Sequence, residues 1–446
     1  MQHKTRSTWL APSLAALPLA LAAAFVAPEA GASGFQLKEN SVQGLGRSYA
    51  GGSSAPGDCS MVANNAAAMG DIGIETCAQV DLNVISFETR FHGSGTDLLG
   101  RPLTGGNGGN GGVTKPVPAM YFTHRLNDAW TIGASVNAPF GFQTEYDDRS
   151  RVRYEAAKSM LESVDLAFAA SYRINDQWSI GGSVLAQRTK AELTQAIDFG
   201  TILAAPTNGA LLPQEADGFG GLSGDDWGYG FTFGLLWKPT DSDRIGFNYH
   251  SQIDHTLAGD AKFRVPSNVA PLLGGAFQNQ GGKADFKTPW FATLSWWHTV
   301  DERLSFGVDA SYTHWSSFKD LLIRYEDAAM APFTRAQDFE WEDTWMFAFG
   351  GDYRLDDRWT LRAGVAFDQT PTIDRTRTPR VPDGDRTWLS IGVGYRWSDA
   401  LRFDAGFVHL WVEDGKVDHT ASTYSTVIGH FKSSANVFGI SGQYAF

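Results

Sequence analysis

Few residues of this chain have the types and spacing that covalent chemistry requires. No Gly-x-Ser-x-Gly elbow occurs, and the run Gly221-Leu222-Ser223-Gly224 does not form one. The sequence gives His250, His255 and His314 no acidic partner that would make them a catalytic pair. We therefore expect a protein that is not an enzyme and that carries no cofactor.

Two cations suggest binding rather than catalysis. Arg188 and Lys190 form an R-x-K pattern that could hold the head group of an acidic ligand, because a carboxylate is costly to bury without a cation. Basic residues at the outer end of a strand are equally typical of lipopolysaccharide contacts or of solvated charges. The formal net charge of −13 argues against a nucleic-acid partner. The role of the two cations depends on the elements that position them.

Six tight polar turns punctuate the chain, and each is followed by a bulky residue and then by apolar/polar alternation. The turns read Leu126-Asn127-Asp128-Ala129-Trp130, Ile174-Asn175-Asp176-Gln177-Trp178, Asp241-Ser242-Asp243-Arg244-Ile245, Val300-Asp301-Glu302-Arg303-Leu304, Leu355-Asp356-Asp357-Arg358-Trp359 and Trp397-Ser398-Asp399-Ala400-Leu401. Such turns with period-two strands are typical of transmembrane β-barrels. If all six turns and both chain ends lie on one side of a membrane, the chain forms seven hairpins. The predicted fold is an all-β, fourteen-stranded antiparallel barrel.

The alternation predicts which face of each strand meets lipid. In residues 359–368, the apolar series that begins at Trp359 opposes a series that contains Arg362 and Asp368, so these charges should point into a lumen. A soluble β-sandwich or barrel is the alternative. It would give the turn-flanking aromatics no common level to occupy, whereas in a membrane Trp and Tyr form interfacial belts.

The two ends of the chain indicate export to an outer membrane. Residues 1–32 combine basic residues, an apolar stretch and the site Ala30-Gly31-Ala32, as a cleaved secretory signal does. A transmembrane helix is the weaker alternative, because two prolines interrupt the stretch. The chain ends on the aromatic Phe446, as many outer-membrane barrels do. In an oxidising compartment we expect a disulfide between Cys59 and Cys77, since these cysteines have no neighbouring metal ligands.

Residues 33–78 do not follow the strand pattern. They are rich in small residues, and the segment is too short to build its own core. Placed inside the lumen, it would borrow packing from the barrel of residues 79–446 and would plug the pore. A flexible periplasmic extension is the alternative.

Several motifs resemble the long-chain fatty-acid outer-membrane transporter family (FadL type), which includes toluene-channel and OmpP1-like proteins. They are Ser33-Gly34-Phe35-Gln36-Leu37, Gly44-Leu45-Gly46-Arg47-Ser48-Tyr49-Ala50-Gly51, Asn64-Asn65-Ala66-Ala67, Tyr312-Thr313-His314-Trp315-Ser316-Ser317-Phe318, residues 359–368, residues 382–390 and Gln443-Tyr444-Ala445-Phe446. In the plug, or hatch, the family usually carries Asn-Pro-Ala where this chain has Asn65, Ala66 and Ala67. This departure puts the rigidity of that turn in doubt.

The resemblance implies a monomeric barrel that takes hydrophobic molecules from outside and releases them sideways at a kinked third strand. The candidate kink is Pro139, Phe140 and Gly141, because proline cannot donate to the ladder and glycine tolerates a bend. Alternatively, Pro139 only ends the strand. Phe35 resembles the hatch residue beside the family's inner binding pocket, although it could equally be hatch packing.

Two external loops are unusually apolar. The first, residues 197–219, contains the candidate contacts Phe199, Leu203, Leu212 and Phe219, and the second covers residues 265–277. These side chains must be buried against a ligand or against each other. The R-x-K pattern at Arg188 also resembles that of the family at this place.

The predicted function is therefore transport of hydrophobic compounds, with long-chain fatty acids preferred. A channel for small aromatic hydrocarbons is the alternative, because both substrates need an apolar pocket and only the acid needs a cation. A general porin for hydrophilic solutes is a weaker alternative, since its pore would have to be open. The expected partners are fatty acids or other hydrophobic small molecules, outer-membrane lipid and lipopolysaccharide.

Overall fold

The computed structural model describes residues 34–421 and 424–446. The predicted signal, residues 1–32, lies outside the described residues. Helical segments are short: α2 (Val42–Leu45), α3 (Met61–Asn64), η1 (Ala66–Asp71), α4 (Phe199–Leu203), η2 (Ala270–Leu272), η3 (Trp315–Ser317) and η4 (Ala328–Phe333). None of the helices in the described ranges has the length and apolar character needed to cross a bilayer.

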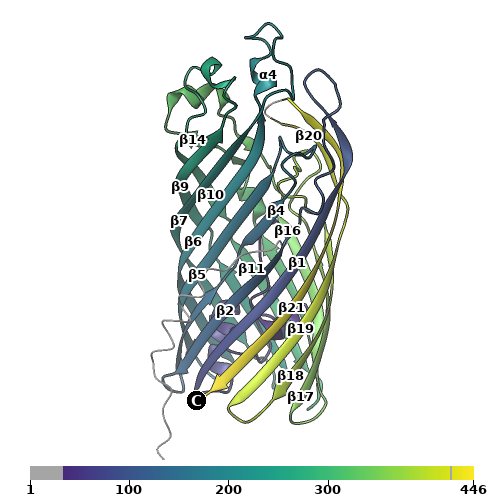
Figure 1. Ribbon diagram of the computed structural model, residues 1–446. Helices are drawn as coiled ribbons and strands as arrows, with labels where there is room; N and C mark the ends of the chain where they lie inside the picture. The colour runs from purple at the N-terminus through teal and green to yellow at the C-terminus, as the bar shows by residue number, and fades with distance from the viewer. Residues whose placement is uncertain (1–33, 422–423) are drawn as a thin grey trace, which may run out of the picture.

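The chain forms a closed antiparallel β-barrel of 14 spans, as predicted (Figure 1). Nineteen segments make up the sheet, because five of the spans are interrupted. Their bounds are β1 (Thr76–Thr96), β2 (Thr114–Arg125), β3 (Trp130–Asn137), β4 (Gly141–Glu145), β5 (Lys158–Arg173), β6 (Trp178–Asp198), β7 (Asp217–Trp237), β8 (Asp243–His250), β9 (Ile253–Arg264), β10 (Gln280–Thr288), β11 (Phe291–Thr299), β12 (Leu304–Thr313), β14 (Ile323–Tyr325), β16 (Thr344–Arg354), β17 (Trp359–Asp368), β18 (Arg386–Arg396), β19 (Leu401–Val412), β20 (Gly415–Thr420) and β21 (Thr426–Ala445). The interrupted spans are β3/β4, β8/β9, β10/β11, β12/β14 and β19/β20. β21 pairs with β1 and closes the barrel, and β13 (Asp320–Leu321) forms a separate small sheet with β15 (Gln337–Asp338).

The six polar turns join consecutive spans, and a side-chain cap explains their sequence. In the first turn, Asn127 Oδ1 accepts hydrogen bonds from the N–H groups of Ala129 and Trp130, both at 2.9 Å. Asn175, Asp301 and Asp356 cap their turns in the same way. These turns and the carboxy terminus lie at one end of the barrel, which we call the turn end (Figure 1). The long loops and α4 lie at the opposite end, the loop end.

The predicted alternation is confirmed along the strands. On β17, Trp359 and Leu361 are exposed on the outer face, whereas Arg362 and Asp368 are buried in the lumen. Aromatic pairs that are exposed or half-buried gather near the turns: Trp130 with Tyr172, Trp178 with Trp237 and Trp359 with Tyr395. An apolar outer wall with an aromatic belt is the surface that a lipid bilayer requires.

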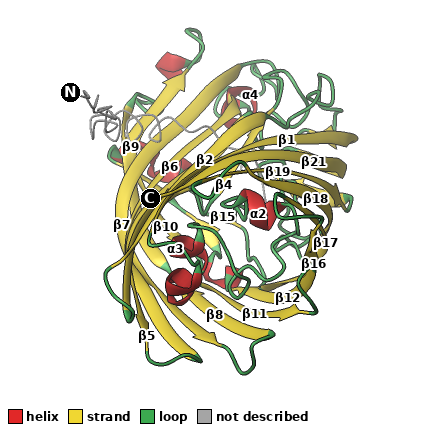
Figure 2. Cartoon of the chain, turned by 90° about the horizontal axis from the view of Figure 1, so that it is seen from below, coloured by secondary structure: helices red, strands yellow, loops and turns green. Residues whose placement is uncertain are grey.

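The segment before β1 is folded inside the lumen, where α2 and α3 are surrounded by the strands (Figure 2). We call residues 34–75 the hatch. Apolar hatch side chains such as Leu45 and Met69 pack against the inner wall. Ion pairs add to this contact: Arg47 lies 3.1 Å from Asp352, and Asp71 pairs with Arg173, Lys238 and Arg244 of the wall.

Candidate functional site

The third span is broken at the predicted kink. β3 ends at Asn137, which pairs with Asp165, and β4 begins at Gly141, which pairs with Glu162. Three residues of the third span, 138–140, therefore face two residues of β5, which is the geometry of a β-bulge. Ser163 holds the bulge, because its Oγ accepts from the N–H of Phe140 at 3.0 Å and donates to its carbonyl at 2.9 Å.

The bulge opens the wall between the second and third spans. The β2–β3 ladder stops at the pair Met120 and Val136, and in the described part of the chain β4 pairs with β5 alone. The upper half of β2 is thus an unpaired edge. Pro116 and Pro118 stand in this stretch, paired with β1 on one side, and lack N–H groups, as suits an edge strand. Toward the loop end, the glycine-rich loop that joins β1 to β2, residues 97–113, closes the opening, with the Glu145 N–H donating to the Gly111 carbonyl at 2.9 Å.

The start of the hatch occupies the broken ladder from the inside. The Leu37 N–H donates to the Pro139 carbonyl at 2.8 Å, and the Gly141 N–H donates to the Phe35 carbonyl at 2.7 Å. Gln36 and Phe140 form an antiparallel bridge between these two bonds. Backbone groups that the bulge frees from the wall are therefore paired by the hatch.

We call these hydrogen bonds between the hatch and the third span the latch. An apolar pocket of about 760 Å³ lies on the loop-end side of the latch. Phe35, the predicted ligand contact, lies at its base, and its ring packs edge-on against Trp315 with the centroids 4.6 Å apart. The rest of the lining comes from the wall and from external loops and is almost wholly apolar: Phe142, Met160, Leu161, Leu193, Leu222, Leu257, Phe286, Phe318, Leu321, Phe339 and Val381 are among its residues.

One cation, Arg380, faces this apolar pocket. It lies in the loop between β17 and β18, and its guanidinium donates to Ser159 Oγ at 3.2 Å, to Gln337 Oε1 at 3.2 Å and to Gln195 Oε1. All three acceptors are neutral. Glu155, a carboxylate that acts on it electrostatically, is engaged by His419 at 3.0 Å. Burial lowers the pKa of Arg380 to about 10, so that it remains charged at neutral pH.

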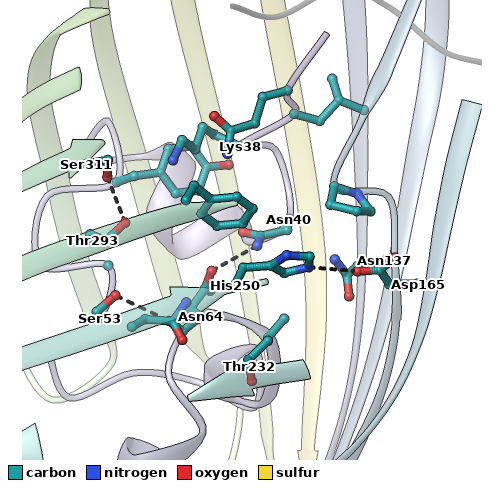
Figure 3. Close-up of a pocket in the computed structure, with 18 of the residues that line it drawn as sticks. Lys38, Asn40, Ser53, Asn64, Asn137, Asp165, Thr232, His250, Thr293 and Ser311 are labelled. Carbon is teal, nitrogen blue, oxygen red and sulfur yellow. Dashed lines mark hydrogen bonds and ion pairs between the residues drawn. The ribbon is translucent and has the colours of Figure 1, made fainter. Parts of the chain in front are cut away.

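A second cavity, of about 850 Å³, lies below the latch and is more polar (Figure 3). We call it the lower chamber. Its wall carries a chain of hydrogen bonds in which Asp165 accepts from Gln187 at 2.7 Å and lies 3.3 Å from His250 Nε2. Pro139 of the kink and Lys38 of the hatch also line it. Among the described residues, no cluster of three or more His, Cys, Asp or Glu has a geometry that could hold a metal.

The loop residues predicted to contact a ligand mostly pack on one another. Phe199 and Leu203 are fully buried in a cluster with Val269, Leu273, Phe277 and Met330 of the neighbouring loops. Leu212 is half-buried, and Phe219 lies on the outer side of β7 with the Arg264 guanidinium 5.4 Å from its ring. Other residues of these loops, such as Ile197 and Ile202, line an open vestibule that meets the apolar pocket at Arg380.

Arg188 and Lys190 point away from every lumenal cavity. Residues 179, 183, 185, 187 and 189 of β6 are buried toward the lumen, so the even-numbered residues face outward. Arg188 pairs with Asp225 of β7 at 3.1 Å, and Lys190 is exposed. These two predicted head-group contacts therefore lie on the outer face of the barrel, where the strand parity set by Trp178 places them.

The hatch residues Asn65, Ala66 and Ala67 begin the 3₁₀ helix η1. Asn65 is completely buried and caps the helix, since its Oδ1 accepts from the Ala67 N–H at 3.1 Å. Its Nδ2 donates to the carbonyls of Ser53 and Leu235, at 2.8 and 3.1 Å. The side chain of Asn65 thus fixes the turn that lacks the family's proline.

Cys59 and Cys77 form a disulfide, with their Cα atoms 6.2 Å apart. Cys77 belongs to β1, which begins at Thr76, three residues before the predicted start of the barrel. The bond therefore joins the hatch to the wall.

Sequence reasoning missed Arg380, Lys38 and the two prolines of β2. A signal existed for the prolines, because two of them in one strand indicate an unpaired edge. For Arg380 none existed, since its position depends on contacts of its loop with β5, β6 and β15, which lie far away in the sequence.

The comparisons with known proteins agree with this architecture. The profile of the family described as "Outer membrane protein transport protein (OMPP1/FadL/TodX)" matches residues 23–446. A 47 kDa outer membrane protein of Pasteurella multocida is 31% identical over 96% of this chain and 97% of its own. A long-chain fatty acid transport protein of Escherichia coli O6:H1 is 29% identical over 96% of this chain and 98% of its own. The crystal structure of a Pseudomonas aeruginosa FadL homologue superimposes with a TM-score of 0.87, at 31% identity, over 93% of this chain and all of that one.

Proposed function

Because the chain belongs to the OMPP1/FadL/TodX family of outer-membrane transport proteins, we propose that its substrates are long-chain fatty acids. The family consists of transporters and channels for hydrophobic compounds and not of enzymes. In the proposed cycle the external loops capture the acid, the apolar pocket binds it, and the opening beside β3 releases it into the outer membrane. The turn end, with the hatch, faces the periplasm.

One observation carries the choice of substrate: a single cation lines an otherwise apolar pocket. An alkyl chain matches the apolar wall, and a carboxylate matches Arg380, whose three contacts are to neutral oxygens. A charge-assisted hydrogen bond is about twice as strong as a neutral one and favours an acid over an uncharged lipid. Arg380 also lines the vestibule, so it stands where a ligand would pass from the loops into the pocket.

Binding of radiolabelled oleate and of oleyl alcohol to the purified protein tests this proposal. We expect Arg380→Gln to weaken oleate binding by roughly tenfold or more and to leave oleyl alcohol binding unchanged, because only the acid uses the charge. Arg188→Gln, on the outer face, is the matched control and should bind both lipids as the wild type does. Equal oleate binding by Arg380→Gln and the wild type would exclude the head-group role.

The release step is supported by the unpaired edge of β2 and by the bulge at Pro139. A molecule that leaves through this opening reaches lipid without crossing the polar hatch contacts. We further propose that the protein acts as a monomer, and that Arg188 and Lys190 contact lipopolysaccharide on the outer face.

A channel for small aromatic hydrocarbons is the second candidate, and the aromatic lining favours it. Phe35, Phe142, Phe286, Phe318 and Phe339 all face the pocket. Growth of a deletion strain on oleate or on toluene as the sole carbon source separates the two functions. Loss of growth on oleate alone supports the acid, and loss on toluene alone supports the hydrocarbon.

A further inference from the structure

Lys38 is a cation on the hatch that faces the lower chamber. Its ammonium forms no ion pair with the described residues, and it lies 5.3 Å from the centroid of the Phe291 ring. Most cations that face the lumen are paired, as Arg47 is with Asp352. A half-buried ammonium without a counter-ion in contact needs a reason, because desolvation disfavours its charged form.

The acids around Lys38 are each engaged elsewhere. Asp309 accepts from the N–H groups of Gly51 and Gly52, at 2.6 and 3.0 Å, and from Ser295 Oγ at 2.6 Å. Asp368 lies 4.0 Å from Arg386. Glu39 accepts from the backbone N–H of Lys38 itself, at 3.0 Å. These three acids act on Lys38 electrostatically, and none of them forms an ion pair with its ammonium.

The rest of the chamber does not compete for that anion. Asp165 is already held by Gln187 and His250, and most other polar groups that line the space are neutral amides and hydroxyls, as Figure 3 shows for Asn40, Asn64 and Asn137. A carboxylate in the chamber would therefore meet hydrogen-bond donors together with one positive charge that no carboxylate of the described residues contacts.

The hatch segment places Lys38 between the upper pocket and the side opening. Phe35 closes the base of the apolar pocket, whereas Gln36, Leu37 and Lys38 line the lower chamber. Pro139, at the opening, lines the same chamber. A ligand that moves from the pocket toward the opening must displace Phe35 and then passes Lys38.

We propose that Lys38 is a second head-group site, which receives the carboxylate of a long-chain acid after it leaves Arg380 and holds it while the alkyl chain enters the side opening. This inference rests on the proposed function. It assigns the hatch an active part in passage, since the residue that meets the ligand belongs to the plug and not to the wall.

The test compares uptake of oleate and of oleyl alcohol by cells that lack their own fatty-acid transporter and express this protein. We expect Lys38→Met to slow oleate uptake by roughly tenfold, to leave oleyl alcohol uptake unchanged, and to leave oleate binding at the Arg380 site within about twofold of the wild type. Lys38→Arg should restore oleate uptake. The matched control is Lys262→Met, because Lys262 is exposed outside the lumen.

The outcomes separate this inference from the proposed function. Equal slowing of both lipids would assign Lys38 a structural role only, and unchanged uptake of both would remove the site. In either case Arg380-dependent binding of oleate can persist, whereas its absence in the wild type would end the proposed function itself. Heat-modifiable migration on gels confirms a folded barrel, and Lys38→Gln replaces Lys38→Met if the latter does not insert.

Discussion

The N–H of Leu37 donates a 2.8 Å hydrogen bond to the carbonyl of Pro139, so the plug pairs with the wall at the point where the wall does not pair with itself. The hydrogen-bond ladder of the wall is therefore interrupted at this point, and the hatch covers the interruption from the lumen. Passage through this point requires both the bulge and the movement of a few hatch residues.

Replacement of the kink proline tests whether the bulge serves release. Pro139→Val supplies an N–H and favours an extended strand, so the β2–β3 ladder should lengthen and the opening should narrow. We expect oleate uptake to fall roughly fivefold or more while binding to the purified protein stays unchanged, since a gating step and not the pocket is altered. Pro239→Val, in a turn at the turn end, is the control. Normal uptake by Pro139→Val would show that release follows another path.

A glycine of the wall determines whether the hatch fits. A β-carbon at Gly234 would lie 2.1 Å from Asn65 Oδ1, the atom that caps η1. Gly234→Ala should displace this cap and loosen the plug by about 2 kcal/mol, within the usual range for overpacking. The expected result in a planar bilayer is a steady ion conductance that the wild type lacks. The control is Gly442→Ala, because a β-carbon at Gly442 would lie 3.7 Å from its nearest neighbour, an atom of the Phe403 ring. This variant should show no steady conductance. A large ohmic pore in the wild type would instead favour a general porin.

The disulfide should stabilise the hatch rather than the barrel. Cys59 and Cys77 are 18 residues apart, and a loop of this length contributes about 3 kcal/mol in the chain-entropy account. In the Cys59→Ser/Cys77→Ser variant we expect limited proteolysis to cut the hatch, while the barrel keeps its heat-modifiable migration. Reduction of the wild type should reproduce the effect. Resistance of the hatch in both experiments would show that packing alone secures it.

Docking of the hatch should depend on pH through Glu39. Burial raises the pKa of this carboxyl from 4.5 to about 7, against the smaller opposing effect of Arg386. The docked state therefore keeps a proton that the undocked state loses above pH 4.5. The free energy that favours docking is therefore greatest below pH 4.5. It decreases by on the order of 3 kcal/mol as the pH rises to about 7, and it is constant above that pH. Hydrogen exchange of the α2 amides, corrected for intrinsic rates, measures this change. The Glu39→Gln variant should show no such slope, and a flat wild-type profile would contradict the assignment.

Local rules predicted the barrel well, because each turn carries its own cap and each bulky residue after a turn sets the parity of its strand. The same parity, counted from Trp178, already places Arg188 and Lys190 on the outer face of the barrel. The Pro139 kink and the position of Phe35 could also be predicted, since one depends on local backbone chemistry and the other on a motif. The position of Arg380 and the packing of Phe199 and Leu203 depend on contacts between segments far apart in the sequence, which no local pattern encodes.

The covalent link at Cys59 has a consequence for the permeability of the cell envelope. A plug fastened to β1 cannot leave the lumen as one body, so the space for a passing molecule must come from a few residues near Phe35 that shift and return. The largest aperture during a cycle is then set by that segment and not by the diameter of the barrel. A cell can import a hydrophobic nutrient through such a protein without admitting the antibiotics that would pass through a wide aqueous channel.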